Sequence, residues 1–88
     1  MGMFDGQVVL VTGGATGIGR SISETFANEG ALVSIVDIDA QAGNSAISQI
    51  HSTGGKAILV ESDLGNSLGC KEAVIKTVSN LGSIDVLV

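Results

Sequence analysis

Short apolar runs alternate with segments of helical periodicity along the whole chain. The apolar runs are rich in β-branched residues, are bounded by glycine or polar residues, and cover residues 8–11, 32–36, 57–60 and 84–88. Unbroken runs of this kind are typical of strands that are buried on both faces of a parallel sheet. After the first run, Ile18, Ile22 and Phe26 recur every four residues before Gly30. This spacing indicates an amphipathic helix that ends at the glycine.

Two further segments have helical spacing. Ala46, Ile47 and Ile50 form an apolar stripe within residues 40–52, and a similar stripe marks residues 73–81. The resulting order is β-α-β-α-β-α-β, with short links and without a linker, repeat or low-complexity tract. We therefore expect residues 1–88 to belong to a single α/β domain.

The handedness of the crossovers predicts how the strands are arranged. Right-handed connections place the first two helices on one face of the sheet if the first three strands step outward in one direction. The third connection then returns past the first strand, which gives the strand order 3-2-1-4 and puts its helix on the opposite face. This is part of a Rossmann-type, doubly wound parallel sheet, and its switch point lies between the first and fourth strands. Open sheets of this kind bind ligands at the switch point.

Charge and polarity exclude several classes of protein. Nine acidic residues against four basic ones give a net charge of −5, which argues against binding to nucleic acid because such binding rests on clustered Lys and Arg. At 44% hydrophobic residues and 13 glycines, the chain is too apolar to be disordered. No apolar run approaches the roughly 18 residues that span a bilayer, and the first residues do not resemble a signal peptide. We expect a cytoplasmic protein that binds neither nucleic acid nor membranes.

Cys70 is the single cysteine of the chain. An intrachain disulfide and a C-x-x-C metal site are therefore excluded, and we expect no metal site. No clear base accompanies the thiol, so the sequence favours a packing role for Cys70 over a nucleophilic one.

A glycine-rich turn joins the first predicted strand to the first helix. Gly13, Gly17 and Gly19 give the spacing G-x-x-x-G-x-G. Gly13 permits a tight turn, Gly17 lets the backbone approach a pyrophosphate, and Gly19 allows close packing of the helix on the sheet. The N–H groups and dipole at the helix N-terminus then bind phosphate without a lysine. We expect this turn, including Thr16 and Ile18, to bind the pyrophosphate of a dinucleotide.

Asp37 is placed to bind a ribose. It follows the second predicted strand and lies 20 residues beyond Gly17, where a carboxylate accepts hydrogen bonds from both ribose hydroxyls of an adenosine. A 2′-phosphate at this point would face the carboxylate, and Thr16 and Ile38 stand where Arg or Lys would be needed to bind it. The sequence thus predicts NAD in preference to NADP, with Ile38 beside the adenosine.

A second phosphate-loop interpretation starts at Gly14. Residues 14–21 nearly fit G-x-x-x-x-G-K-[ST], with Arg20 in place of the lysine. Arg and Lys are not equivalent at a phosphate clamp, and a triphosphate-binding loop explains neither Gly13 nor the spacing to Asp37. A P-loop NTPase therefore remains the weaker alternative.

The chain resembles the short-chain dehydrogenase/reductase family along essentially its whole length. The matching segments are the Phe4-Asp5-Gly6-Gln7 lead-in, Thr-Gly-x-x-x-Gly-Ile-Gly at 12–19, Glu29-Gly30-Ala31, Asp63-Leu64 and residues 84–88. In that family the residue that matches Asp63 binds the adenine amino group, and the backbone of the residue that matches Leu64 contacts the ring. The resemblance therefore adds Asp63 and Leu64 to the expected cofactor-binding residues.

The resemblance also implies what this chain does not carry. The family's catalytic serine and Tyr-x-x-x-Lys pair come after a later Asn-Asn-Ala-Gly motif, whereas this chain has no tyrosine. It is expected to be the amino-terminal, cofactor-binding part of a homo-oligomeric oxidoreductase that acts on an alcohol or carbonyl substrate, truncated in or after the fourth strand. We expect no catalytic residue on it and no turnover by it alone. A non-catalytic nucleotide-binding module is the alternative from a different class.

Overall fold

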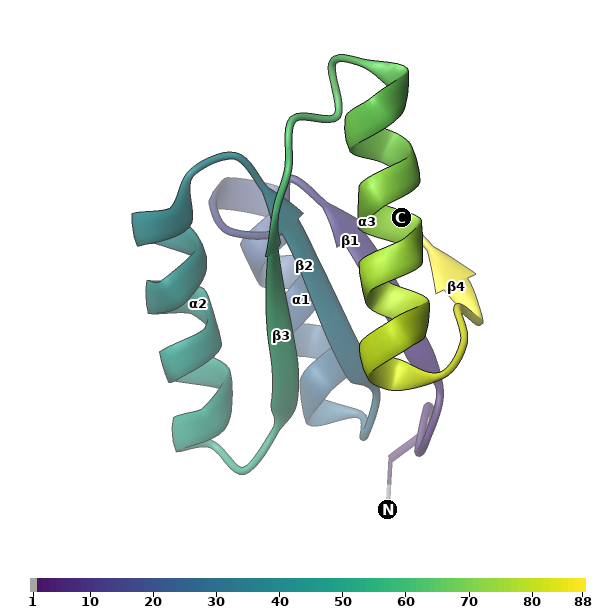
Figure 1. Ribbon diagram of the computed structural model, residues 1–88. Coiled ribbons are helices and arrows are strands. Elements are labelled where there is room, and N and C mark those ends of the chain that lie inside the picture. Colours follow the sequence, from purple (N-terminus) through teal and green to yellow (C-terminus); the bar gives the residue numbers. More distant parts are fainter. Residues whose placement is uncertain (1) are drawn as a thin grey trace.

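A computed structural model describes residues 2–88 and shows three βα units followed by a short strand. Their bounds are β1 Val8–Thr12, α1 Gly17–Asn28, β2 Leu32–Asp37, α2 Ala40–Ser52, β3 Lys56–Glu61, α3 Ser67–Leu81 and β4 Val86–Leu87. The strands form one parallel sheet in the order β3-β2-β1-β4 (Figure 1). The predicted fold class and strand order are confirmed.

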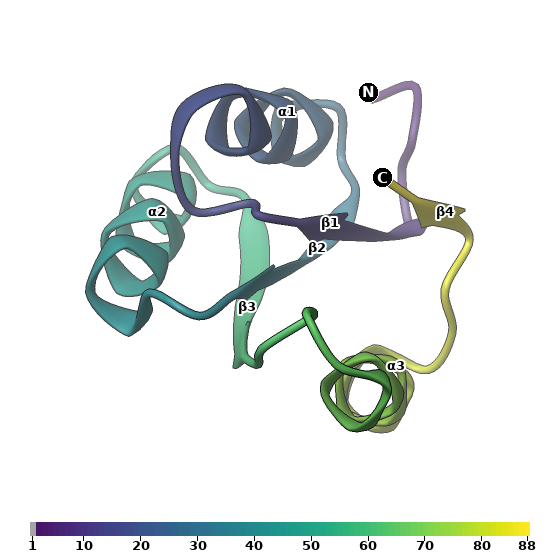
Figure 2. The same ribbon diagram turned by 90° about the horizontal axis from the view of Figure 1, so that it is seen from above.

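The sheet lies between two helical layers. Helices α1 and α2 cover one face, and α3 alone covers the other (Figure 2). This arrangement follows from right-handed crossovers, because the chain reverses its direction across the sheet only between β3 and β4. The carboxyl ends of β1, β2 and β3 consequently share one edge, and the loops that leave these strands meet there.

Alternation along the strands divides the core into two parts. Val9 and Val11 of β1 and Ile35 of β2 are fully buried beneath α1 and α2. Leu10 of β1 and Val36 of β2 point to the opposite face, where they pack beneath α3. A strand whose successive residues are all apolar supplies both layers at once. The continuous apolar runs of the sequence thus reflect burial of both sheet faces.

Helix α3 begins at Ser67, well before the predicted helical stripe at residue 73. Asn66 caps it, since its side-chain oxygen accepts a hydrogen bond from the Gly69 N–H (2.7 Å). The first turn is exposed, apart from Gly69. Apolar periodicity therefore marked only the part of the helix that covers the sheet.

The fourth strand is shorter than the predicted residues 84–88, because only Val86 and Leu87 have strand geometry. They pair with Val9 and Leu10. Asp85 anchors the start of the pairing: its N–H donates to the Val8 carbonyl (2.8 Å), and its Oδ2 accepts from the Val8 N–H (2.7 Å). The carboxylate thus satisfies a buried backbone donor at the beginning of β1.

Cys70 is exposed, so the predicted packing role is wrong. Gly69, Ala73 and Thr77 form the buried stripe of α3, and Cys70 lies on the flank of that stripe. A single residue of displacement around a helix is enough to move a side chain out of the sheet contact.

Helices of this fold are short. The longest within residues 2–88 is α3, with 15 residues, and none of the described helices is long and apolar enough to cross a membrane.

Candidate functional site

The glycine-rich turn runs from the end of β1 to the beginning of α1. Gly13 and Gly17 have φ values of +63° and +54°, in the left-handed region that favours glycine. The Gly13 N–H donates to the Val36 carbonyl of β2 (2.8 Å). The turn is therefore fastened to the neighbouring strand directly after it leaves β1.

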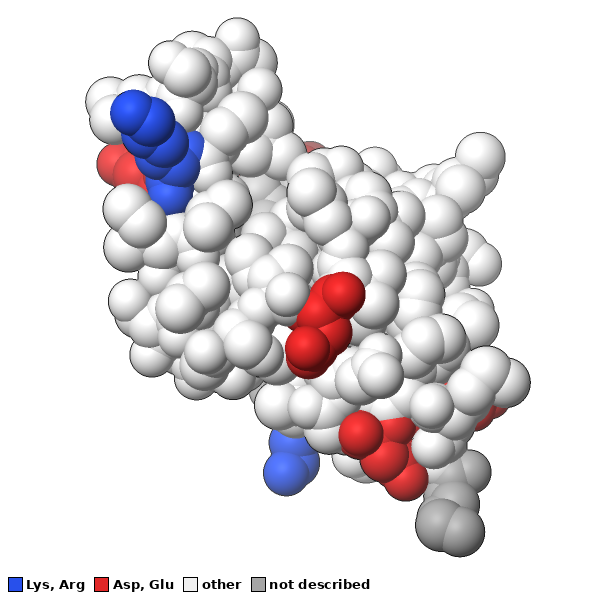
Figure 3. Space-filling model, turned by 90° about the vertical axis from the view of Figure 1, so that its right-hand side faces the viewer, with Lys and Arg blue, Asp and Glu red and all other residues white. Residues whose placement is uncertain are grey.

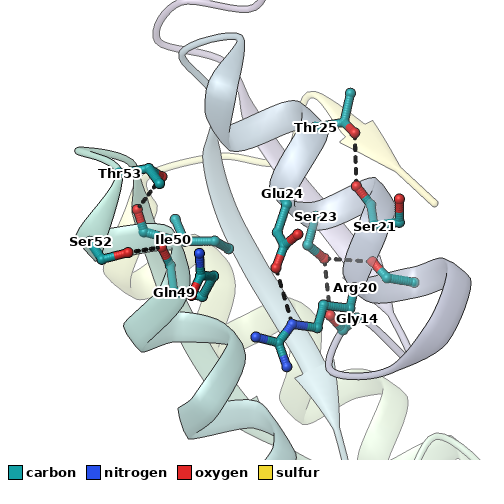
Figure 4. A network of polar contacts seen from close by, with 11 residues as sticks. Gly14, Arg20, Ser21, Ser23, Glu24, Thr25, Gln49, Ile50, Ser52 and Thr53 are labelled. Carbon is teal, nitrogen blue, oxygen red and sulfur yellow. Dashed lines mark hydrogen bonds and ion pairs between the residues drawn. The ribbon is translucent and has the colours of Figure 1, made fainter.

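Gly19 allows the first turn of α1 to contact the glycine-rich turn itself. A Cβ atom on Gly19 would overlap the carbonyl oxygen of Gly13. Ser23, one helical turn further on, is fully buried, and its hydroxyl lies 3.2 Å from the Gly14 carbonyl and 2.9 Å from the Gly19 carbonyl (Figure 4). Ser23 thus ties α1 to the turn, a role that sequence periodicity did not single out.

The N-terminus of α1 differs from those of the other two helices. Thr16 occupies its N-cap position with extended backbone angles, and the Thr16 side chain makes no capping hydrogen bond. By contrast, Asp39 caps α2 and Asn66 caps α3 through their side chains. The first N–H groups of a helix have no intrahelical acceptor, so those at the start of α1 are suited to an external anion. Ile18, in this first turn, is 81% exposed.

Asp37 is the last residue of β2, and its carboxylate reaches the glycine-rich turn. Its Oδ2 accepts from the Ala15 N–H (3.2 Å), and its Oδ1 accepts from the Asp39 N–H (3.0 Å). The structure thus brings the predicted ribose-binding residue and the predicted phosphate-binding turn into direct contact. Ile38, the next residue, projects into solvent with 65% exposure.

Asp63 and Leu64 follow β3 at the same edge of the sheet. Asp63 is exposed, and its Oδ1 accepts from the Gly65 N–H (2.8 Å), so it bonds within its own loop. Leu64 is half-buried and packs against the core beneath α3. Gly69 brings α3 close to this loop, because a Cβ there would overlap the Asp63 carbonyl oxygen. The sequence carried no periodic signal for Gly69.

An apolar cavity lies on the α3 side of the same edge. Its volume is about 370 Å³, and it is lined by Leu10, Thr12, Leu64, Cys70, Ala73, Val74 and Leu87. The face of the molecule on the β4 side carries few charged side chains (Figure 3). Of the residues expected to bind the cofactor, Leu64 is the one that also lines this cavity.

Arg20 does not point to the turn as a phosphate clamp would. Its Nε donates to Glu24 Oε2 (3.0 Å) on the next turn of α1 (Figure 4). The pairing agrees with a solvated ion pair on the helix surface and gives the P-loop alternative no support. Among residues 2–88, no group of three His, Cys, Asp or Glu side chains is arranged to hold a metal ion.

These features define the class of the protein. A parallel sheet of order 3-2-1-4, with a glycine-rich βα turn at its switch point and a carboxylate at the end of β2, is a Rossmann-type fold. Residues 7–88 match the family described as short chain dehydrogenase, and the chain therefore belongs to the short-chain dehydrogenase/reductase family. The resemblance drawn from its motifs is confirmed.

Proteins similar in sequence include oxidoreductases and a stress protein. General stress protein 39 of Bacillus subtilis is 42% identical over 84 residues, which cover 94% of this chain and 29% of that protein. The 7α-hydroxysteroid dehydrogenase of Escherichia coli K12 is 36% identical over 84 residues, covering 96% of this chain and 33% of that protein. The chain thus spans about a third of the length of these relatives.

Solved structures agree with this assignment. The structure of 7α-hydroxysteroid dehydrogenase complexed with NADH and 7-oxo glycochenodeoxycholic acid is similar with a TM-score of 0.93 and 34% sequence identity, over 96% of this chain and 33% of that one. A citronellol catabolism dehydrogenase of Pseudomonas aeruginosa gives a TM-score of 0.94 at 32% identity, over 98% of this chain and 36% of that one.

Proposed function

We propose that this chain forms the adenosine-pyrophosphate half of the NAD site of an oxidoreductase that acts on alcohol or carbonyl groups. The observation that carries the proposal is the hydrogen bond between the Asp37 carboxylate and the Ala15 N–H. It joins the residue proposed to bind the ribose to a glycine-rich turn that leads into a helix without a side-chain N-cap. The solved relative that contains NADH supports the same class of cofactor.

The glycine-rich turn and the beginning of α1 fit the pyrophosphate of the cofactor. The N-terminus of α1 can stabilise negative charge through its backbone N–H groups and the helix dipole. The residues around it are Gly13, Thr16, Gly17, Ile18 and Gly19. The turn meets no side chain at the Cβ positions of Gly13 and Gly17, so a phosphate can approach the backbone there. In the proposed complex, NAD supplies the nicotinamide ring that accepts or donates a hydride.

Asp37 makes NAD the preferred cofactor in this proposal. A 2′-phosphate would bring negative charge against the carboxylate, and exposed Ile38 offers no cation to offset it. The penalty is about 1–3 kcal/mol, or about 5- to 150-fold in affinity. Ribose hydroxyls, by contrast, donate hydrogen bonds to the carboxylate.

Asp63 and Leu64 are assigned to the adenine. They lie after β3, on the same edge as the turn, so an adenosine extended from Asp37 along this edge would reach them. The Asp63 carboxylate accepts one N–H from Gly65 and retains lone pairs for an exocyclic amine. The half-buried side chain of Leu64 offers apolar area to the ring.

The proposed reaction needs groups that this chain does not contain, since the chain has no tyrosine. We assign the catalytic acid/base and the alcohol- or carbonyl-binding residues to the remainder of a complete enzyme, which we propose to be a homo-oligomer. By itself the chain is expected to bind nucleotide without turning over substrate.

Titration calorimetry with split ligands tests this proposal. ADP-ribose should bind the chain about as tightly as NAD, whereas nicotinamide mononucleotide should give no measurable heat, because only the adenosine half has a site. Comparable binding of nicotinamide mononucleotide, or no binding of ADP-ribose at millimolar concentration, would contradict the assignment. Alcohol-dependent reduction of NAD by the purified chain would contradict the absence of turnover.

A further inference from the structure

Asp37 accepts a hydrogen bond from the backbone of the turn, in addition to its proposed contact with the ribose. Each of its carboxylate oxygens accepts one N–H: Oδ2 from Ala15 in the middle of the turn (3.2 Å) and Oδ1 from Asp39 (3.0 Å). Ala15 is fully buried, so its N–H gains an acceptor that solvent would not readily replace. The carboxylate therefore stabilises the backbone of the turn before any ligand binds.

Two consecutive residues of β2 hold the same turn. The Val36 carbonyl accepts from the Gly13 N–H (2.8 Å), and Asp37 accepts from the Ala15 N–H two residues later. Backbone amides bind a phosphate more tightly when their directions are fixed in advance, because less ordering entropy is then lost on binding. The Asp37 contact fixes the part of the turn that leads directly into Thr16 and the beginning of α1.

We infer that Asp37 is a positioning residue, which orders the glycine-rich turn for phosphate binding independently of its contact with the ribose. This inference rests on the proposed function and extends it. A carboxylate has about four lone-pair positions. Two accept the N–H groups of Ala15 and Asp39, and the other two match the two hydroxyls of a ribose.

The inference adds a second reason why a 2′-phosphate is rejected. A phosphate group has no hydroxyl to donate to Asp37, and repulsion would turn the carboxylate away from the sugar. That movement breaks the bond to the Ala15 N–H, so a phosphorylated cofactor also weakens the site for its own pyrophosphate.

A two-by-two binding experiment separates the roles of Asp37. ADP and 2′,3′-dideoxy-ADP are titrated into the unaltered chain and into Asp37→Asn. The dideoxy ligand cannot contact Asp37 through hydroxyls, yet the substitution should weaken its binding about fivefold, since Asn offers one uncharged acceptor oxygen in place of the two carboxylate oxygens that hold the Ala15 and Asp39 N–H groups. If Asp37 acts only on the ribose, the substitution will not weaken dideoxy-ADP, and the inference is overturned.

Asp39→Asn is the matched control. It removes the same charge two residues away, and the Asp39 side chain caps α2 through the Ala42 N–H (3.0 Å) rather than contacting the turn. Removing a negative charge should strengthen the binding of an anionic ligand slightly, and to a similar extent in both variants. A net loss of dideoxy-ADP affinity should appear only in Asp37→Asn, and an equal loss in both variants would overturn the inference.

A measurement without ligand keeps the inference separate from the proposed function. The Ala15 amide should exchange with solvent about fivefold faster in Asp37→Asn than in Asp39→Asn. Equal exchange rates of the Ala15 amide in the two variants would overturn the positioning role, whereas failure of ADP to bind the unaltered chain would overturn only the proposed function.

Discussion

Two glycines of the turn do different work, although both are spaced as a phosphate-binding motif requires. Gly17 adopts a left-handed backbone, and a Cβ on it would meet nothing within 4 Å. Gly19 has no positive φ, but a Cβ on it would overlap the Gly13 carbonyl oxygen. Gly17 is therefore required by its backbone conformation, and Gly19 by close packing.

Alanine substitutions should separate these requirements. Gly17→Ala should lower the free energy of unfolding by about 1 kcal/mol, which is the cost of a left-handed alanine. Gly19→Ala should cost about 3 kcal/mol, because the backbone itself must move. Urea denaturation measures both, and Gly54→Ala serves as the control, since Gly54 has a φ of +85° and open surroundings at the opposite edge of the sheet. Equal losses for Gly17→Ala and Gly19→Ala would contradict the packing role of Gly19.

The proposed cofactor preference also rests on single residues. The double substitution Asp37→Ser and Ile38→Arg should shift preference toward NADP, because it removes the opposing carboxylate and adds a cation beside the 2′-position. We expect the ratio of NADP to NAD affinity to rise at least about tenfold. Calorimetric titration of both cofactors provides the measurement. Equal affinity of the unaltered chain for NAD and NADP would contradict the role assigned to Asp37.

At the scale of elements, α3 is joined to the sheet by a pair of hydroxyls within the core. Ser34 of β2 and Thr77 of α3 are fully buried, and their oxygens lie 2.8 Å apart. The Thr77 hydroxyl donates to the Ala73 carbonyl (2.7 Å), so the hydrogen between the pair comes from Ser34. This contact fixes α3 against the middle of the sheet and, with it, the loop that carries Asp63.

Removing either hydroxyl should therefore have unequal effects. Ser34→Ala leaves Thr77 bonded to its own helix and should cost about 1 kcal/mol, whereas Thr77→Val leaves the Ser34 hydroxyl buried without a partner and should cost about 2 kcal/mol. The double variant should cost less than the sum of the two. Thr25→Val on the exposed surface of α1 is the control, because Thr25 makes the same type of bond to Ser21. Strict additivity in chemical denaturation would rule out the coupling.

Sequence patterns predicted the elements that bury apolar area on both sides. Continuous apolar runs identified β1, β2 and β3, and the apolar stripe of Ala46, Ile47 and Ile50 identified α2. The exposed first turn of α3 could not be found in this way, since its position depends on the Asn66 cap and on the close approach allowed by Gly69. The short extent of β4 depends on its pairing with β1, which local periodicity does not encode.

The arrangement of the candidate site was predictable where spacing along the chain fixes spacing in the fold. The turn and Asp37 end adjacent parallel strands, so strand order alone brings them to one edge. The contact between Asp37 and Ala15, and the support from Ser23, could not be predicted because they depend on side-chain directions. Asp85 likewise showed its role only once β4 was placed beside Val8.

At the scale of the whole molecule, the proposed site binds an anion within a chain of net charge −5. Arg20 is paired with Glu24, and the Lys76 ammonium lies 3.9 Å from Glu72. We therefore assign the attraction for phosphate to backbone amides, which act at short range. The net negative charge of the chain opposes it with a weak repulsion at long range. Salt screens the second effect much more than the first, because the Debye length falls from about 30 Å at 0.01 M to about 8 Å at 0.15 M.

Affinity for NAD should consequently rise, by about twofold, as ionic strength increases over this range. Titrations at several salt concentrations measure the slope. The opposite slope, with affinity falling steeply as salt is added, would indicate that Lys or Arg side chains bind the phosphates instead.

The most direct test of the whole account is to map the bound nucleotide on the chain. In an NMR titration with NAD, the amide signals that move should be those of residues 13–19, 37–38 and 63–64, at the carboxyl edge of β1, β2 and β3. Signals that move mainly around the apolar cavity between α3 and β4, or no movement at millimolar NAD, would contradict it.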